Sequence, residues 1–486
     1  MHDHPSRTFS RRLSLLASIG LAIVLGAGIT WYKGHRTATV AVASQRRRPD
    51  VVVVLTDDQF YNTLWSMPIV RSQLVRKGVR FADMFASNPL CAPSRASILT
   101  GQYSHTTGVY DNAPSSFGSA EAFHDSGYES STMATWFHAA GYRTGIVGKY
   151  VNGFAGGWTP PAWDESAIGA GYWGPTLYEN GVKHTYPHST YETTLLGDKA
   201  VGFITGAPRD RPLLLYLAPY APHENASPEP KYAHLPVDLG RDWPRPNFDE
   251  ADVLDKPSFI RSIPRLGASG RWEVNWLRRR QYRTLRSVDD MVGRVLAALK
   301  TRGSLQNTIV VFMSDNGQMW GSHRMRADAK RVPYDESLRL PLVVRWDGHT
   351  AAGRTSRRMV SNIDIAPTLA ALAGVRVPGR TDGVSFAPLL RDPVGPPVRR
   401  SLLLEQAAGP KIQSDRVYTP NYCGLRTARY TFVHYADGEQ ELYDDRRDPY
   451  QLSNLAGDPR SSRQAGRLAS RTRALCTPAP PGVRWR

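Results

Sequence analysis

One stretch decides the fold of this chain: Asp50-Val51-Val52-Val53-Val54-Leu55-Thr56-Asp57-Asp58. Its first six residues are almost all apolar and rich in β-branched side chains. Such a short, continuous apolar run is typical of a strand that is buried on both faces of a sheet. The run ends directly in a threonine and two carboxylates. It therefore predicts a central strand with acidic side chains at its carboxyl end.

The same pattern occurs twice more along the chain. The apolar run at 211–217 leads into Ala221-Pro222-His223, and the run at 307–313 leads into Ser314-Asp315-Asn316-Gly317. Open α/β sheets bind their ligands in the crevice beyond the carboxyl ends of the strands. We therefore expect the polar residues that follow these three strands to converge on one site.

The segments between and after the strands indicate helices and a second, smaller region. Apolar residues recur at helical spacing over 277–300, which predicts a helix packed on the sheet. The Pro-, Asp- and Arg-rich segment 226–270 is typical of a long surface excursion. Hairpin strands at 430–435 and 440–443, followed by a helix that runs through Arg473, indicate a small α+β domain. We expect an N-terminal leader at 1–44, a large domain at 45–395 and a C-terminal domain at 396–486.

The composition is that of a globular protein with a strong positive charge. The chain has 486 residues, of which 41% are hydrophobic and 21% charged, and its formal net charge is +18. A field of that sign attracts nucleic acid, anionic lipid and sulfated glycans alike. The sequence has no zinc-finger spacing, RNA-recognition signature or basic zipper region, so we do not expect nucleic acid as a partner.

The N-terminus resembles an export leader. Arg11-Arg12 precedes the apolar run 13–31, and Ala41-Val42-Ala43 is a plausible cleavage site. Because the run is near the length that spans a bilayer, a cleaved signal and an uncleaved anchor both stay open. In either case we expect the rest of the chain to be secreted, periplasmic or anchored outside the cytoplasm, with membrane contact only through this segment.

The segment Cys91-Ala92-Pro93-Ser94-Arg95-Ala96-Ser97-Ile98-Leu99-Thr100-Gly101 carries the most specific signal. It resembles the sulfatase signature C-x-P-S-R with its L-T-G continuation, in which a maturation enzyme oxidises the cysteine to formylglycine. The hydrated aldehyde has two hydroxyls, one to attack sulfur and one whose deprotonation expels sulfate. The resemblance implies that Arg95 holds the hydrate and offsets charge. A helix that begins near Ser94 is also expected, and its N-terminus would favour an anionic group.

Four oxygen donors stand at the ends of two predicted strands: Asp57, Asp58, Asp315 and Asn316. Carboxylate and amide oxygens suit a hard cation, whereas zinc favours His and Cys. Together with the Cys91 motif they match the metal ligands of the sulfatase family. The resemblance implies one Ca²⁺ per chain, with the modified Cys91 at the metal as well.

Basic residues must bind the sulfate and protonate the leaving alcohol. Lys149 lies in a match to the family's G-K-[WY] element, His223 in its P-H element, and Lys330 is similar to its second lysine. Many members have a histidine base where this chain has Val151. The form Gly148-Lys149-Tyr150-Val151-Asn152 instead resembles the glucosamine-6-sulfatase and extracellular heparan 6-O-endosulfatase branch. The base stays open among His105, His323 and Asp315.

The resemblance extends over about residues 49–476 and implies an alkaline-phosphatase-like α/β fold. This fold has a large mixed sheet sandwiched by helices and a smaller α+β C-terminal domain with a four-stranded antiparallel sheet. It implies a sulfuric ester hydrolase for sulfated saccharides such as N-acetylglucosamine-6-sulfate, with substrate contacts from Lys149, His223, Lys330 and Asn152. In the pocket beyond the sulfate, which must set specificity, the candidate contacts are Asn152, His223, Asn225 and Arg331.

Two matters beyond the active site follow from the resemblance and the composition. Cysteines at corresponding places in the lysosomal glucosamine-6-sulfatase, together with export and an odd cysteine count, imply a disulfide between Cys423 and Cys476.

Two other functions stay open. One is a phosphonate or phosphodiester hydrolase of the same superfamily, and the other is a non-catalytic polyanion-binding protein.

Overall fold

The apolar run at 50–55 forms the centre of a ten-stranded sheet. The computed structural model describes residues 48–114, 117–241, 243–408 and 419–485. In it, β1 spans Asp50–Thr56, and all seven residues are buried. It pairs in parallel with β8 (Leu213–Ala218) on one side and with β9 (Thr308–Ser314) on the other. All three predicted strands are therefore confirmed, side by side.

The sheet is mixed. Most neighbouring strands are parallel, whereas β10 runs antiparallel to both of its neighbours and β6 does the same. Across the sheet the strands are β11 (Arg354–Ser356), β2 (Val79–Phe81), β10 (Leu342–Arg345), β9, β1, β8, β4 (Arg143–Gly148), β5 (Glu165–Ile168), β6 (Thr176–Glu179) and β7 (Val182–Thr185). Two short strands, β3 (Met84–Phe85) and β12 (Val360–Ser361), pair beside it.

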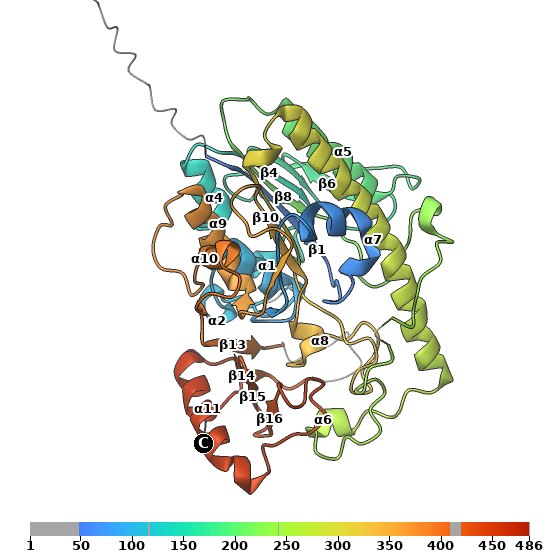
Figure 1. The fold of residues 1–486 in the computed structure, drawn as a ribbon, viewed down its shortest axis with the longest axis vertical. Helices are drawn as coiled ribbons and strands as arrows, with labels where there is room; N and C mark the ends of the chain where they lie inside the picture. The colour runs from blue at the N-terminus through green and yellow to red at the C-terminus, as the bar shows by residue number, and fades with distance from the viewer. Residues whose placement is uncertain (1–47, 115–116, 242, 409–418, 486) are drawn as a thin grey trace, which may run out of the picture. The chain divides into compact units, whose positions relative to one another are not determined.

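Helices cover both faces of the sheet, as expected for a central strand that is apolar on each side. Val51, Val53 and Leu55 pack into one buried cluster with residues of α1, α4 and α9, while Val52 and Val54 pack into another with α5 and α7. Figure 1 shows these two sets of helices on opposite sides of the strands. The helices are α1 (Cys91–Thr100), α2 (Ser104–Thr107), α3 (Ser119–Asp125), α4 (Met133–Ala139), α5 (Glu192–Gly206), α6 (Ser258–Arg261), α7 (Ala268–Arg302), α8 (Asp335–Leu338), α9 (Ile365–Ala373), α10 (Ala387–Arg391) and α11 (Ser462–Leu475).

The long predicted helix begins earlier than its sequence pattern indicated. Helix α7 begins at Ala268 rather than at Leu277. Its first turns project beyond the sheet and bury few side chains, so no apolar pattern marks them in the sequence. Trp272 is 64% exposed there. The excursion at 226–270 is largely irregular, as predicted, and its described residues form only two short helices, Pro230–Tyr232 and α6, before α7 begins.

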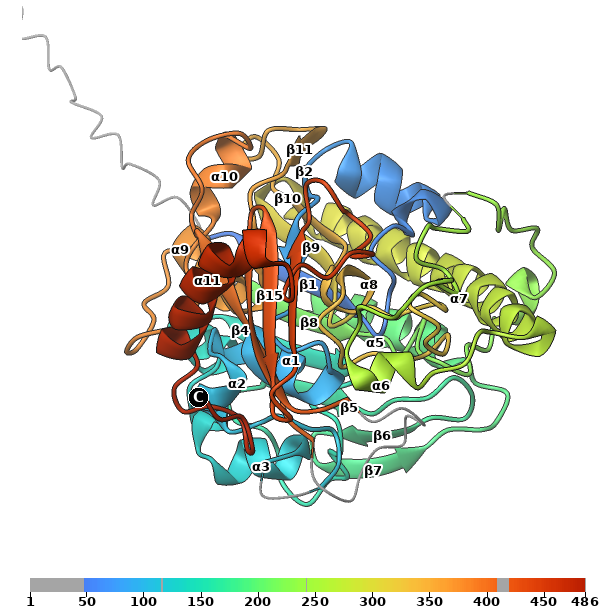
Figure 2. The ribbon, with the colours of Figure 1, turned by 90° about the horizontal axis from the view of Figure 1, so that it is seen from below.

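The C-terminal region forms a four-stranded antiparallel sheet in the order β13 (Ser401–Gln406), β14 (Tyr422–Thr427), β15 (Tyr430–Tyr435) and β16 (Gln440–Asp444). Figure 2 shows α11 beside this sheet, and the buried Leu468 of α11 packs with Leu425 and Phe432 of the sheet. A shared buried cluster joins residues of this sheet to residues of the large sheet's loops, such as Leu403 and Met319. The domain boundary at 395/396 stays a prediction.

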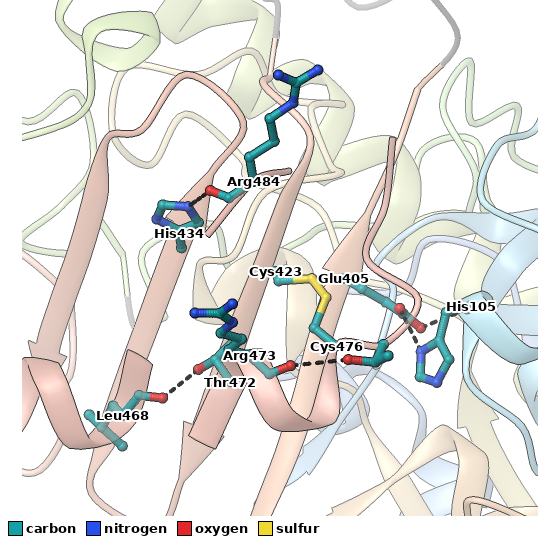
Figure 3. Close-up of a disulfide and its surroundings, with 10 residues drawn as sticks. His105, Glu405, Cys423, His434, Leu468, Thr472, Arg473, Cys476 and Arg484 are labelled. Carbon is teal, nitrogen blue, oxygen red and sulfur yellow. Dashed lines mark hydrogen bonds and ion pairs between the residues drawn. A yellow bond between two sulfur atoms is a disulfide. The ribbon is translucent and has the colours of Figure 1, made fainter. Parts of the chain in front are cut away.

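The predicted disulfide is present. Cys423 of β14 is bonded to Cys476, which directly follows α11, and their Cα atoms lie 6.4 Å apart (Figure 3). The bond joins the last helix to the small sheet. Cys91 is a free, buried cysteine.

The predicted leader at 1–44, including the choice between signal and anchor, lies outside the described residues. Within the described part of the chain, no helix is both long and apolar enough to cross a bilayer.

Candidate active site

The polar residues that follow the parallel strands converge at one edge of the sheet, as expected. Asp57 and Asp58 follow β1, Lys149 follows β4, and Asp315 follows β9. The side chains of Asp57, Asp58 and Asp315 are at most 1% exposed, so their charges lie in a medium that screens them weakly. Asp58 also has a left-handed backbone (φ 62°), a sparsely populated conformation for a non-glycine residue and one found at functional sites.

Cys91 begins helix α1, three residues earlier than the sequence indicated. Leu90 before it is extended, and Pro93 falls in the first turn, where a residue without an N–H is tolerated because that donor would have no partner within the helix. The first turn of a helix carries partial positive charge. The side chain at position 91 therefore sits where the backbone favours an anionic group.

Cys91 lies between carboxylates and an ammonium group. Its Sγ is 3.5 Å from Oδ1 of Asp57, 3.7 Å from Oδ1 of Asp58 and 3.2 Å from Nζ of Lys330. Burial raises the pKa of the Cys91 thiol well above its usual value, although Lys149 and Lys330 oppose the shift. A thiol in this state is a poor nucleophile, because the reactive species is the thiolate.

Each of the two adjacent aspartates has its own lysine. Nζ of Lys149 is 2.5 Å from Oδ2 of Asp57, and Nζ of Lys330 is 2.7 and 2.8 Å from the two oxygens of Asp58. Burial alone would raise the pKa of Asp57, but Lys149, His223 and Arg95 outweigh it and lower that pKa to about 2. The pKa of Asp58 is also lowered, since Lys330 and His223 outweigh its burial. Both side chains are therefore carboxylates at neutral pH.

Asp315 is held by Arg95, which is fully buried. Nε of Arg95 donates to Oδ2 of Asp315 at 2.8 Å, and Nη1 donates to the backbone oxygen of Lys149 at 2.8 Å. The other carboxylate oxygen of Asp315 accepts from the backbone N–H of Asp58 at 3.1 Å. Arg95 thus connects the loop after β4 to the loop after β9 through these two hydrogen bonds. Asp315 in turn connects the loop after β9 to the loop after β1.

The residues present fit a hard divalent cation. Donor atoms of Asp57, Asp58, Cys91 and His223 all lie within 4.8 Å of one another. Asn316 donates to Oδ1 of Asp58 at 2.5 Å, and its own Oδ1 is buried without a hydrogen bond to any described residue. A set dominated by carboxylate and amide oxygens is the kind that Ca²⁺ selects. Three predicted ligands, Asp57, Asp58 and Cys91, thus group with His223, while Asp315 and Asn316 each contact Asp58.

His223 is the histidine of this cluster. Its Nε2 is 3.5 Å from Oδ2 of Asp58, and its ring stacks on Tyr220 with centroids 4.5 Å apart. Burial lowers the pKa of His223, although Asp58 and Asp57 oppose the shift. The ring therefore lies beside Asp58, on which Lys330 also converges.

The histidines considered as alternative bases lie elsewhere. Nδ1 of His105 is 2.9 Å from Glu405 of the small sheet (Figure 3), and Nδ1 of His323 is 2.5 Å from Glu250. Within the described residues, neither ring hydrogen-bonds to Cys91, Asp57 or Asp58. Asp315 lies in the cluster, but its oxygens are engaged by Arg95 and by the backbone of Asp58.

Apart from His223, the candidate specificity residues differ in their surroundings. Asn152 accepts a hydrogen bond from the N–H of Ala120 through its backbone oxygen, at 2.7 Å. Asn225 is exposed and has a left-handed backbone (φ 61°). Arg331 is buried and ion-paired with Asp111 at 3.0 Å, so its side chain is already engaged within the protein.

Sequence reasoning missed two residues that contact the cluster. Nε2 of Gln318 donates to Oδ2 of Asp58 at 3.0 Å, and the ring of Tyr220 lies 5.6 Å from the ammonium of Lys149. Both lie in loops that follow predicted strands, at positions 318 and 220. Their place after a strand is the only available signal, and it does not distinguish them from other loop residues.

Known proteins resemble this chain over most of its length. Residues 49–375 match the family model described as Sulfatase, and residues 321–476 match one described as N-sulphoglucosamine sulphohydrolase, C-terminal. The chain is 32% identical over 360 residues to the extracellular sulfatase SULF-1 homolog of Drosophila melanogaster, covering 72% of this chain and 32% of that protein. It thus spans about a third of the fly protein's length.

Two further comparisons cover most of this chain and most of the related protein. The N-acetylglucosamine-6-O-sulfatase of Bacteroides thetaiotaomicron is 27% identical over 492 residues, covering 85% of this chain and 83% of that protein. A solved structure of BT4656 in complex with its substrate, D-glucosamine-2-N,6-O-disulfate, has a TM-score of 0.75 and 24% sequence identity, covering 89% of this chain and 98% of that chain. The structural likeness shows a shared fold, and the expected alkaline-phosphatase-like arrangement of a large mixed sheet with a smaller antiparallel sheet is confirmed.

Proposed function

The chain belongs to the sulfatase family, and from that premise we propose that it hydrolyses sulfate esters of saccharides, using a formylglycine made from Cys91 and one bound Ca²⁺. The observation that carries the proposal is the position of Cys91. Its side chain is fully buried at a helix N-terminus, among the carboxylates of Asp57 and Asp58 and beside the ammonium of Lys330. That is the surrounding that a metal-assisted nucleophile requires.

The formylglycine would supply the attacking hydroxyl and a second hydroxyl for release of sulfate, and Ca²⁺ would neutralise charge on the sulfate oxygens. Asp57, Asp58, Asp315 and Asn316 would hold the cation. Arg95 keeps Asp315 oriented through the 2.8 Å hydrogen bond from its Nε and holds the Lys149 backbone through its Nη1. Arg95 is therefore a positioning residue as well as a buried counter-charge.

Three further groups of this chain would act on the substrate. Lys149 and Lys330 place two ammonium groups around position 91, where they attract the sulfate and offset its charge. His223 carries the imidazole of the cluster, which makes it the candidate for proton transfer to the leaving alcohol. All three groups lie within ion-pair distance of Asp57 or Asp58, so they surround the position where the sulfate would bind.

The proposed substrate class is a 6-O-sulfated glucosamine. It rests on the form Gly148-Lys149-Tyr150-Val151-Asn152 and on the likeness to an N-acetylglucosamine-6-O-sulfatase. We place the mature enzyme outside the cytoplasm on the basis of the leader-like segment 1–44 and the extracellular sulfatase among its relatives.

Labelling with an aldehyde-reactive probe tests the proposed nucleophile. Protein produced together with a formylglycine-generating enzyme should react at residue 91, and Cys91→Ala should neither react nor turn over substrate. Cys91→Ser is the matched variant: it keeps a hydroxyl but cannot eliminate sulfate, so it should also be inactive in steady state. Full turnover by the alanine variant would refute the mechanism.

A substrate comparison tests the chemistry and the branch. Hydrolysis of glucosamine-6-sulfate, galactose-6-sulfate, a 2-O-sulfated uronate, an aryl sulfate and a phosphonate monoester is measured under identical conditions. We expect the highest kcat/KM for glucosamine-6-sulfate. A large preference for the uronate or aryl sulfate would reject the 6-O assignment. A preference for the phosphonate would reject the sulfatase assignment.

A further inference from the structure

A second basic cavity lies away from the catalytic cluster. It has a volume of about 550 Å³, and none of the residues assigned to catalysis or metal binding lines it. Four arginines contribute to its wall: Arg80, Arg245, Arg339 and Arg357. Among the described residues that line it there is no aspartate or glutamate. Behind the wall, Arg339 pairs with Asp83 and lies 3.7 Å from Asp335, and Arg245 lies 3.9 Å from Glu336, so the positive charge that can attract an anion is mainly that of Arg80 and Arg357.

Two of these arginines are already engaged. Arg339 donates from Nε to the backbone oxygen of Ala82 at 2.7 Å and pairs with Asp83 at 2.9 Å. Arg245 lies over the rings of Phe60 and Tyr61, at 4.6 and 4.8 Å, and also donates to the hydroxyl of Tyr61. These contacts hold two guanidinium groups rigidly at the cavity wall.

The other two have no such partner. Within the described part of the chain, neither Arg80 nor Arg357 forms a side-chain hydrogen bond or an ion pair. Partial burial lowers the pKa of Arg80, and the charges of Arg339 and Arg357 lower it further, with only Asp83 opposing them. Several guanidinium groups are therefore close enough to repel one another. A bound anion would relieve that repulsion, and guanidinium groups suit tetrahedral oxyanions because they can donate two hydrogen bonds at once.

The sheet places these two arginines together. Arg80 of β2 lies opposite Thr355 of the neighbouring strand β11, and Arg357 comes two residues after Thr355. Arg357 directly follows β11, which ends at Ser356, and both arginines line the same cavity. Figure 2 shows β11, β2, β10, β9 and β1 side by side in that order.

The cavity also lies on the catalytic side of the sheet. Phe81, at the carboxyl end of β2, is level with Leu342, and Leu342 is level with Met313 near the carboxyl end of β9. Three strand spacings separate β2 from β1, which corresponds to about 14 Å. Tyr61, which lines the cavity, follows Asp58 by only three residues. The cavity and the catalytic cluster therefore lie along the same edge of the sheet.

We propose that this cavity is a non-catalytic subsite that binds a second sulfate group of the same saccharide chain, with Arg80 and Arg357 as its principal ligands. The choice of a sulfated saccharide as occupant rests on the proposed function. The rings of Tyr61, Trp243 and Tyr450 at its wall offer apolar surface for the sugar that carries the sulfate. The enzyme would then favour chains with several sulfates over a single sulfated sugar.

The binding test uses the full-length Cys91→Ala protein, which cannot consume its ligand. Titration calorimetry with a heparin hexasaccharide compares this protein with the same protein that also carries Arg80→Ala and Arg357→Ala. The matched control carries Arg463→Ala and Arg471→Ala, two exposed arginines of α11, and so loses the same charge elsewhere. We expect the cavity variant to bind about tenfold more weakly, since two charged contacts are lost, and the control to change less than about twofold.

A kinetic test on the active enzyme separates this subsite from the catalytic one. The cavity variant should keep the wild-type kcat and KM for glucosamine-6-sulfate and show a raised KM for the sulfated hexasaccharide. Equal weakening by both arginine pairs, or no weakening by either, would overturn the proposal. Tighter binding of a single-stranded oligonucleotide, lost in the same cavity variant, would overturn the assigned ligand class. Loss of turnover on every sulfate ester with intact cavity-dependent binding would reject the proposed function and leave the subsite standing.

Discussion

Replacing Arg95 with methionine should cost both stability and activity. Arg95 and Asp315 are each 0% exposed, and Nε of the arginine is 2.8 Å from Oδ2 of the aspartate. The same guanidinium also donates to the backbone oxygens of Lys149 and Tyr150, at 2.8 and 3.4 Å. Methionine fills a similar volume but supplies no charge and no donor. Asp315 would be left buried without its main counter-charge, and two carbonyls would lose their partner.

The size of the effect follows from burial. Removing one partner of a buried ion pair costs about 3–5 kcal/mol, because the remaining charge stays desolvated and unpaired. Unfolding entropy near the transition is about 2.1 cal/mol/K per residue, which gives about 1.0 kcal/mol/K for a chain of 486 residues. We therefore expect Arg95→Met to lower Tm by about 3–5 °C. The shift should be largest in the presence of a chelator, since a bound cation would itself offset the charge of Asp315.

A second substitution tests the cause. Adding Asp315→Asn to Arg95→Met removes the unpaired charge, so the double variant should regain about half of the lost stability but no activity. Arg399→Met is the matched control, because Arg399 forms a similar buried pair with Asp364 (Nε to Oδ2, 2.9 Å) outside the catalytic cluster. It should lower Tm by a comparable amount and leave kcat close to wild type.

The assays are calorimetric unfolding, with and without Ca²⁺, and hydrolysis of a sulfate ester at saturating substrate. Two results would refute the reasoning. One is an unchanged Tm for Arg95→Met in chelator, which would mean that the buried pair contributes nothing. The other is a double variant that is less stable than the single variant, which would mean that Asp315 does not carry the cost.

Three other perturbations have defined outcomes. Exhaustive chelation should abolish turnover and lower Tm, and added Ca²⁺ should restore both. Full activity in the chelated protein, with its metal content checked by mass spectrometry, would contradict a metal-dependent site. Reducing the Cys423–Cys476 disulfide, or replacing both residues by serine, should lower the free energy of unfolding in urea by about 4 kcal/mol, because the bond closes a loop with a sequence separation of 53. Equal urea midpoints for the wild type with and without reductant would argue against this contribution. Burial raises the pKa of Glu192 to about 8 from an ordinary value of 4.5. Between these two pH values the unfolded chain has lost this proton and the folded chain still holds it. The free energy of unfolding should therefore fall by about 1.4 kcal/mol per pH unit as the pH rises from 4.5 toward 8. Glu192→Gln lacks this dependence, so its Tm advantage over wild type should grow between pH 5 and pH 8, and a constant difference would show that the carboxyl does not titrate in that window.

The sequence alone indicated the elements whose signal is local. The apolar run before Asp57 and Asp58 encodes a buried strand because its side chains are apolar on both faces, and β1 is buried along its whole length. The strands that precede His223 and Asp315 carry the same signal. Since parallel strands end at a common edge, their order in the chain was enough to predict that these polar residues meet. The Cys91 motif is contiguous, so it could be recognised without any structure.

Element ends and distant partners were not predictable in this way. Helix α7 begins at Ala268 because a helix, once formed, continues past the part that packs on the sheet, and no apolar stripe marks that extension. Gln318 reaches Asp58 through the path of one loop. The separation of His105 and His323 from the cluster depends on their pairing with Glu405 and Glu250, carboxylates far away in sequence.

The arginine cavity shows most clearly which features local sequence does not predict. Arg80, Arg245, Arg339 and Arg357 are spread over nearly 280 positions of the chain, and each one by itself reads as an ordinary surface arginine. Strand order brings Arg80 of β2 beside the end of β11, which Arg357 directly follows, and the excursion at 226–270 contributes Arg245 to the same cavity. Local sequence determines which residues form strands and which motif carries the nucleophile. The packing of strands and loops that are distant in sequence decides which charges become neighbours, because that choice depends on long-range contacts that no local pattern encodes.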